Sequence, residues 1–286
     1  MTTTTTSAYL SIIQNLPRMQ AMTAAEPAVK TASAYYAANI GKVTTIDQFV
    51  GNYRLLSYAL NAYGLGDQIN STALIKQVLQ GGVTSSTALA NTLPQWKAFA
   101  TAFNFVGNGA ASISTATAVA ATQSDYVEQQ LENNQGQQDV GVQLALYFNR
   151  VAPTVTSTYG ILADQNLLQV VETIFGLPTA FSAENIDVQA STLSNFFNIK
   201  DLQDPAKLTQ LTERFTASYD SLYGSSSGST SSLTVAGSSS STSSASAASS
   251  ILAGVINSTA SSLSSSSSPY FNNALMTSLQ GFKIGG

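Results

Sequence analysis

Residues 45–65 read TIDQFVGNYRLLSYALNAYGL, and this stretch decides the fold class. Thr45 and Gln48 have the spacing of a capping box, in which two side chains satisfy the free amides of a helix start. Gly64 stands where helices commonly end in the left-handed conformation. Between these signals, apolar side chains recur at helical spacing: Ile46, Phe49, Val50, Tyr53, Leu56 and Leu60. The stretch therefore predicts α-helix.

Similar patterns continue to Gly224, and no alternating strand pattern competes with them, so the chain is expected to be mainly α. Asp164 is expected to start a helix that ends at Gly176, Ser182 to cap the next one, and Asp204-Pro205 to open the last. Residues 107–122, which carry no charge, are interpreted as a connector or irregular hairpin. Another helix is expected to start at Asn70 or Ser71 and to close at Gly81-Gly82. A further helix follows the stripe from Leu89 to Phe103, with a break or a new first turn at Pro94. Helix is also expected from Asp125 to Pro153, with a turn near 133–138.

A duplication emerges when the halves are compared at an offset of 112 residues. Pairs that match are Tyr35-Tyr36 with Tyr147-Phe148, Val43-Thr44 with Val155-Thr156, Leu55-Leu56 with Leu167-Leu168, and Gly64-Leu65 with Gly176-Leu177. With four residues of drift, Trp96-Lys97-Ala98-Phe99 falls on Thr212-Glu213-Arg214-Phe215. Chance reuse of common helical pairs is the alternative. Two related helical units suit a structural or assembly protein better than an enzyme.

These patterns divide the chain into six segments. The expected organisation is an N-terminal segment with a short helix (1–30), a first helical repeat unit (31–106), a connector (107–123), a second repeat unit (124–224), a Ser-rich low-complexity tract (225–268) and a short C-terminal helix (269–286). The Ser-rich tract is too polar to bury a core, so it is expected to be mobile in isolation.

The composition excludes several kinds of chemistry. Only 9% of residues are charged, against roughly 25% in ordinary soluble domains. There is no Cys and no His, which removes thiol nucleophiles, disulfides, and every imidazole base or metal ligand. The net charge is −4, and a surface with so few charges favours self-association. Chance composition in a soluble protein is the alternative.

No motif predicts a catalytic, cofactor or metal site, and the chain is not expected to be an enzyme. A phosphate-binding loop, a Ser-x-x-Lys nucleophile and a Gly-x-Ser-x-Gly elbow are all absent from the sequence. Asp125 and Glu128 are one turn apart, as a glycosidase pair could be, but a helix cap explains them better. The acidic residues Asp201 and Asp204 bracket a helix start in the same way.

The sequence also argues against several kinds of binding partner. The 11 basic residues are scattered, so no nucleic-acid interface is expected, and the aromatic residues are interpreted as core. No run is long enough to span a bilayer, and residues 1–7 do not resemble a cleavable signal. Asn70-Ser71-Thr72 and Asn257-Ser258-Thr259 match the N-glycan acceptor pattern, and the Ser/Thr tract could carry O-linked glycans.

Two apolar stripes lie outside the repeat units, one near each end of the chain. A short helix is marginal in water unless its apolar face has a partner. The stripes are therefore predicted to form an interface that holds subunits together, and the alternative is that each packs on its own repeat unit. The residues are Tyr9, Ile12, Ile13 and Leu16 near the start and Phe271, Leu275, Leu279 and Phe282 near the end.

The chain also resembles a known family over about residues 30 to 220. The likeness lies in residues 36–49 (YAANIGKVTTIDQF), 53–56 (YRLL), 62–65 (AYGL), 141–148 (GVQLALYF) and 161–164 (ILAD). It is a domain-of-unknown-function family whose genes lie among flagellar genes in alphaproteobacteria. The resemblance implies a flagellar context and no catalytic residues, and the Ser-rich tract departs from the shorter members of the family.

The sequence thus predicts a non-enzymatic, self-assembling structural subunit of the bacterial flagellum or a related surface filament. Its expected partners are copies of itself and other filament subunits, and its expected location is the cell surface, reached without a cleavable signal. Two alternatives stay open: an adhesin-like surface module that displays the Ser/Thr arm, and a cytosolic flagellar assembly factor.

Overall fold

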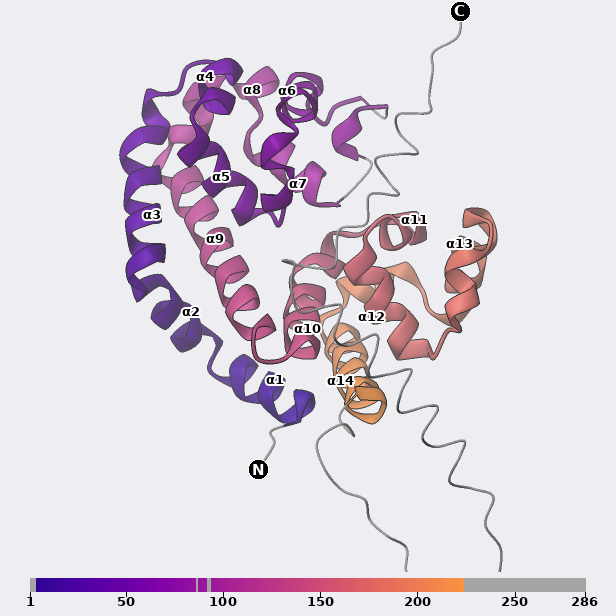
Figure 1. Cartoon of the computed structure of the whole chain (residues 1–286). Helices are drawn as coiled ribbons and strands as arrows, with labels where there is room; N and C mark the ends of the chain where they lie inside the picture. Colours follow the sequence, from indigo (N-terminus) through magenta and orange to yellow (C-terminus); the bar gives the residue numbers. More distant parts are fainter. Residues whose placement is uncertain (1–3, 86, 92–93, 224–286) are drawn as a thin grey trace, which may run out of the picture. The chain divides into compact units, whose positions relative to one another are not determined.

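The computed structural model describes residues 4–85, 87–91 and 94–223, and all regular structure in these ranges is helical. The mainly α prediction is therefore confirmed (Figure 1). None of the described helices is both long and apolar enough to cross a membrane. The α-helices are α1 (Thr5–Gln14), α2 (Leu16–Ala25), α3 (Pro27–Asn39), α4 (Ile46–Gly51), α5 (Tyr53–Ala62), α6 (Thr72–Gly81), α7 (Pro94–Ala102), α8 (Phe105–Asn108), α9 (Ala116–Gly136), α10 (Val140–Val151), α11 (Thr158–Leu162), α12 (Gln165–Phe175), α13 (Ile186–Phe196) and α14 (Pro205–Tyr223).

Short 3₁₀-helices connect many of these elements. They are η1 (Ile40–Lys42), η2 (Gly66–Asn70), η3 (Leu89–Asn91), η4 (Ala110–Ser114), η5 (Ala152–Thr154), η6 (Thr179–Ala183) and η7 (Ile199–Gln203). The turn expected near 133–138 lies between the end of α9 and the start of α10.

Most helix ends follow the local sequence signals. The Thr45 side chain accepts a hydrogen bond from the Gln48 amide (3.2 Å), but Gln48 Oε1 accepts from the amide and hydroxyl of Thr44, so the expected return bond to the Thr45 amide is replaced. Gly64 and Gly176 have φ of 71° and 62°, where a side chain would be strained. The helix start at Asp164 is confirmed by hydrogen bonds from two backbone amides to its carboxylate.

Two expected helix starts were wrong. Helix α9 begins at Ala116 and not at Asp125, because Thr115 caps the Ala118 amide and an alanine-rich turn follows, which favours helix without any apolar stripe. Ser182 lies in η6, where its hydroxyl donates to Glu172, and Asn185 caps α13 instead. The expected closing Gly224, the Ser-rich tract and the C-terminal helix lie outside the described residues.

The buried apolar side chains form two separate cores. The first lies among α3 to α8 and includes Phe49, Leu56 and Phe103. The second lies among α10 to α14 and includes Phe148, Leu167 and Phe215. Tyr9 and Ile12 of α1 also belong to the second core, although the rest of it comes from residues 142–215.

The same succession of elements surrounds both cores. In each, an α-helix (α3 or α10) is followed by a 3₁₀-turn, a short helix, a longer helix, a second 3₁₀-turn and another helix (α6 or α13). The first 3₁₀-turns, Ile40–Lys42 and Ala152–Thr154, are 112 residues apart. The offset of 112 residues that matched the two halves of the sequence is therefore also the distance along the chain between these equivalent 3₁₀-turns.

The two successions differ by one insertion. Helices α9 and α14 both follow a five-residue 3₁₀-turn, η4 or η7, and these turns contact η1 and η5 respectively. This pairs α14 with α9, and not with α7 as the match of Trp96-Lys97-Ala98-Phe99 had suggested. The segment that carries η3, α7 and α8 therefore has no described counterpart in the second half.

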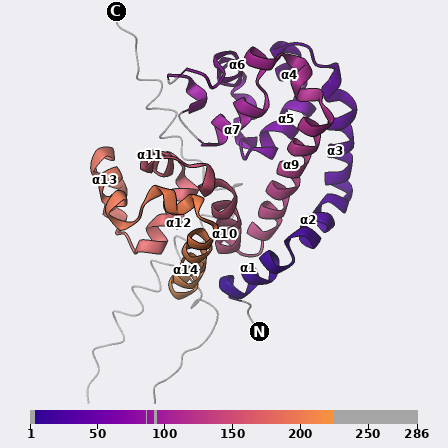
Figure 2. The same ribbon diagram turned by 180° about the vertical axis from the view of Figure 1, so that it is seen from behind.

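The first three helices run along the outside of these elements. Helices α2 and α3 lie beside α9, and α1 lies against α10 and α14 (Figures 1 and 2). The N-terminal helices therefore connect the first core, at α3, to the second core, at α1.

Candidate functional site

The carboxylates that the sequence singled out have structural partners. Asp125 lies inside α9 beside Tyr63 and not at a helix cap, and burial raises the pKa of its carboxyl. Glu128 accepts a hydrogen bond from Gln20. Asp201 is paired with Lys207, and Asp204 caps α14. In the described part of the chain, no group of three or more acidic side chains is placed to hold a metal ion.

A buried polar cluster joins the insertion to the second core. Tyr147 on α10 donates a hydrogen bond to Asp164 Oδ2 (2.6 Å), and Gln95 on α7 donates to the same oxygen (2.6 Å) and to the Tyr147 hydroxyl. Asp164 is 3% exposed, and burial raises the pKa of its carboxyl above the usual range. Because Asp164 accepts from both Tyr147 and Gln95, the cluster links α7 to α10, and Gln95 Oε1 is buried there without a hydrogen-bond partner among the described residues.

A second cluster joins α9 to α10. Arg150 donates two hydrogen bonds to the Glu132 carboxylate (2.6 and 2.8 Å) and one to Gln129 Oε1 (2.8 Å). Burial would lower the pKa of Arg150, but the bonds to Glu132 outweigh it and the net shift is upward. The Glu132 side chain is 4% exposed and that of Arg150 is 22% exposed. This is a nearly buried, bidentate ion pair.

The N-terminal helix is held by a third cluster, which we call the α1 clamp: Thr5, Thr6, Asp139 and Asp220. Asp220 on α14 accepts hydrogen bonds from the amides of Thr5 (2.7 Å) and Thr6 (3.0 Å) and from the Thr6 hydroxyl (2.7 Å). The Thr5 hydroxyl donates to Asp139 (2.8 Å). A carboxylate at the start of a helix satisfies free amides and opposes the positive end of the helix dipole. The clamp therefore fixes the start of α1 on α14.

Apolar contacts continue from the clamp along α1. Tyr9 and Ile12 are 3% and 6% exposed within the second core. The Tyr9 hydroxyl accepts a hydrogen bond from Asn149 (2.7 Å), which also donates to Thr212. The expectation that this stripe lacks a partner in its own chain is corrected for these two residues. Ile13 and Leu16 lie nearer the surface, and Phe271, Leu275, Leu279 and Phe282 lie outside the described residues.

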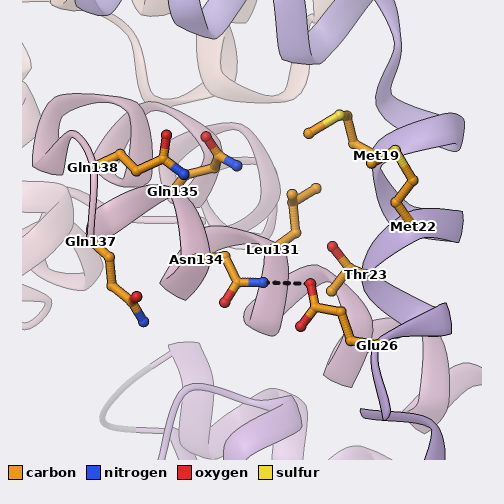
Figure 3. A pocket seen from close by; sticks show the side chains of 9 residues that line it. All are labelled: Met19, Met22, Thr23, Glu26, Leu131, Asn134, Gln135, Gln137 and Gln138. Carbon is orange, nitrogen blue, oxygen red and sulfur yellow. Dashed lines mark hydrogen bonds between the residues drawn. The ribbon is translucent and has the colours of Figure 1, made fainter. Parts of the chain in front are cut away.

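Helix α2 is packed much less tightly than α1. Its only buried residue is Thr23. An open cavity of about 300 Å³ separates α2 from the end of α9, bridged by a hydrogen bond from Asn134 to Glu26 (2.9 Å; Figure 3). A second open cavity of about 210 Å³ lies between the α1–α2 joint and α9 and α10, and is lined by Ile13, Leu16 and Arg150 among others. The second cavity is also lined by Glu128 and Glu132, whose carboxylates accept hydrogen bonds from Gln20 and Arg150 respectively.

Comparison with other proteins places the chain in a family. Residues 62–208, from the end of α5 into α14, match the family described as "Protein of unknown function (DUF1217)". The chain belongs to the DUF1217 family. A crystal structure of a protein from Agrobacterium tumefaciens, determined by a structural genomics consortium, is 38% identical with a TM-score of 0.70. The match covers 76% of this chain and 93% of that one, and no curated protein matches the chain. The family match therefore spans residues of both cores.

The contacts of the α1 clamp were not predicted from the sequence. Thr5 and Asp220 are 215 positions apart, and neither lies in a motif that predicts a contact. The sequence distinguishes Asp220 only as the last acidic residue of the chain.

Proposed function

We propose that this DUF1217 protein is a non-enzymatic structural subunit that self-assembles, in the bacterial flagellum or a related cell-surface filament. The observation that carries the proposal is the way α1 is attached. Tyr9 and Ile12 fill part of the second core from outside residues 140–223, and the intervening α2 has one buried residue. An element that is firmly bound at its end but loosely bound at its connection is suited to exchange between copies.

Exchange of α1 would keep every hydrogen bond of the α1 clamp. In the exchanged form, Thr5, Thr6, Tyr9 and Ile12 of one copy would occupy the surface of α10 and α14 in the next. Such a head-to-tail interface does not use the same patch on both molecules, so it extends into a filament unless the rotation closes a ring. The net cost is small because each interaction broken within one chain forms again between two chains.

Composition and family resemblance support the location in the proposal. Charged residues make up 9% of the chain, which favours association of surfaces over repulsion. The family resemblance implies a flagellar setting, and export to the cell surface is proposed on the same grounds. The expected partners are other copies of this chain and neighbouring filament subunits.

Engineered cysteines test the exchange directly, because the chain has no natural Cys. A Thr6→Cys variant and an Asp220→Cys variant are mixed, incubated and oxidised. Exchange between copies yields covalent dimers of the two variants. A chain carrying both substitutions gives the matched positive control, because docking within one chain closes the disulfide without a dimer. A mixture of Thr6→Cys with Asp67→Cys, at an exposed position far along the chain, measures random collision.

Covalent dimers no more frequent than in the collision control would overturn α1 exchange. Electron microscopy of the purified protein then tests filament formation itself. Fractionation of cells into sheared surface filaments, membranes and cytosol tests the location. Recovery in the cell envelope without filaments would favour an adhesin-like module, and recovery in the cytosol would favour an assembly factor.

A further inference from the structure

Helix α13 lies at the outer edge of the second core, and one side of it is largely uncovered (Figures 1 and 2). Val188, Thr192 and Phe196 follow one another at intervals of four residues, so they lie along one side of the helix. Val188 is 50% and Phe196 47% exposed, and Thr192 is half-buried. The neighbouring Leu193, by contrast, is fully buried in the second core. We call Val188, Thr192 and Phe196 the α13 stripe.

The equivalent helix in the first half has the same side covered. When α6 and α13 are aligned on their N-cap residues, Ser71 and Asn185, the α13 stripe falls on Leu74, Val78 and Gly82. Val78 is 1% exposed. Helix α6 contacts η3, α7 and α8, the elements of the insertion, whereas the main described contact of α13 is with α11. The fold therefore covers this side of the helix in its first half and leaves it open in the described part of its second half.

We propose that the α13 stripes of two copies of this chain pack on each other in antiparallel directions, about a two-fold axis beside Thr192. The α13 stripe is suited to this pairing because an apolar residue lies four positions on either side of Thr192. Val188 of each copy contacts Phe196 of the other, so both ends of both stripes are covered. Ser191, which is exposed beside the stripe, is small enough to let the two helices approach closely.

Charged residues beyond the two ends of α13 favour the antiparallel direction. Glu184, which precedes the helix, and Lys200, which follows it in η7, are each eight residues from Thr192, and both are exposed. Asp201 is already paired with Lys207, and Lys200 has no ion pair within the described ranges. Antiparallel pairing brings Glu184 of each copy toward Lys200 of the other, whereas parallel pairing would bring like charges together.

The surroundings of the α13 stripe add to this complementarity. At one end, Phe196 packs on Phe175 with ring centroids 5.2 Å apart, and the exposed Arg214 places its guanidinium 5.3 Å from the centroid of Phe175. At the other end, Asp187 is exposed and accepts a hydrogen bond from the Tyr159 hydroxyl (2.8 Å). The surface thus has an acidic end, an apolar middle and a basic end, which is a self-complementary order for a two-fold contact.

The proposed contact is small and differs in kind from the exchange of α1. It uses one helix face and its charged ends, so its buried area falls below the total of about 1,200–2,000 Å² that is usual for stable complexes. The pair should therefore be weak in dilute solution and stronger where copies are already held close together. A two-fold contact closes after two copies, whereas head-to-tail exchange continues, and neither depends on the other.

A single engineered cysteine tests the contact in the full chain, which has no natural Cys. Thr192→Cys places one thiol beside the two-fold axis, so mild oxidation should give covalent dimers. The matched control is Ser194→Cys, because Ser194 is exposed on the same helix but about 160° around it from Thr192. The Thr192→Cys dimers should form at least about tenfold faster, because pairing raises the effective concentration of one thiol at the other.

Charge reversal tests the direction of pairing. In the Thr192→Cys chain, Glu184→Lys or Lys200→Glu alone should slow the formation of dimers about fivefold or more, because each creates two like-charge pairs across the axis. Both reversals in one chain should restore the rate, because each new Lys then faces a new Glu. A double variant that forms dimers more slowly than either single variant would overturn the antiparallel contact.

A change on the apolar part of the stripe completes the test. In the Thr192→Cys chain, Val188→Asp should remove the fast formation of dimers, whereas Ser194→Asp should leave it unchanged; both positions are exposed. Equal rates for Thr192→Cys and Ser194→Cys would overturn the proposal, whether the stripe is then bare or covered by another part of its own chain. Mixed dimers of Thr6→Cys with Asp220→Cys would still report α1 exchange, so the two proposals fail separately.

Discussion

Replacing Glu132 with Gln removes one charge from the ion pair that joins α9 to α10. In the structure, both oxygens of Glu132 accept hydrogen bonds from Arg150, and the carboxylate side chain is only 4% exposed. The Gln side chain has almost the same shape, but it offers one acceptor and no negative charge. Glu132→Gln therefore leaves the Arg150 guanidinium in a largely buried place without its counter-charge.

The expected loss of unfolding free energy is about 3 kcal/mol, at the low end of the usual range of about 3–5 kcal/mol for breaking a buried pair. The low end applies because Arg150 is 22% exposed and lines an open cavity, so water can partly replace the lost partner. For a domain of this size, such a loss lowers the melting temperature by about 6–12 °C.

Urea and thermal unfolding, followed by far-UV circular dichroism, measure the change. Glu184→Gln, at an exposed position, is the matched control and should shift stability by less than about 0.5 kcal/mol. A double variant, Glu132→Leu with Arg150→Met, should recover most of the loss, because an apolar pair needs no charge compensation. A loss below about 1 kcal/mol for Glu132→Gln would show that the pair behaves as a solvent-exposed one and would refute the reasoning.

Four further outcomes are expected. Asp220→Asn should speed hydrogen exchange in α1, with a local cost of about 1–2 kcal/mol, because the hydrogen bonds of the α1 clamp lose their charge. Burial would raise the pKa of Asp220, but the hydrogen bonds from Thr6 and Thr5 outweigh it and the net shift is downward. The clamp should therefore be complete above the ordinary aspartate pKa and be lost as the pH falls through the lowered value. Hydrogen-exchange rates in α1 that do not change in this acid range would contradict this expectation. Burial raises the pKa of Asp164, so the wild type should lose stability relative to Asp164→Asn as the pH rises from the ordinary aspartate value through the raised one, which paired denaturation curves at several pH values would show. Chelators and added divalent metals should leave the melting temperature unchanged, whereas a drop of several degrees would reveal a metal site. Deleting residues 228–250 should leave melting cooperative, since a Ser-rich tract has little to contribute to either core, and loss of cooperativity would show that the tract is structural.

Local signals in the sequence were sufficient for much of the fold. Asp164, Gly176 and Gly64 mark helix ends because capping depends on residues within one turn. The start of α9 was missed because residues 116–121 are small and carry no stripe, so periodicity could not detect them. Their helix is set by alanine propensity and by Thr115.

Contacts between distant segments were beyond the reach of such signals. Gln95 and Tyr147 come from α7 and α10, and Asp164 caps α12. Their spacing in the sequence has no period that would place them together. The N-terminal stripe was recognised as apolar, but whether Tyr9 would pack in its own core or on another subunit depends on how α14 approaches α1. That approach is settled by the fold as a whole and by hydrogen bonds such as those of Asp220.

The attachment of α1 to α14 also sets an order of events during translation. Thr5 leaves the ribosome 215 residues before its partner Asp220. At synthesis rates of about 5–20 residues per second, that interval is about 10–40 s. The first core can form in the second half of this interval, once residues 36–113 have been made, whereas Tyr9 and Ile12 of the nascent chain have no completed surface to occupy until its end. On a polysome, the apolar residues of α1 in each new chain are therefore exposed while finished copies are close by. The relative rates of folding and of association decide whether α1 binds its own chain or a neighbouring copy.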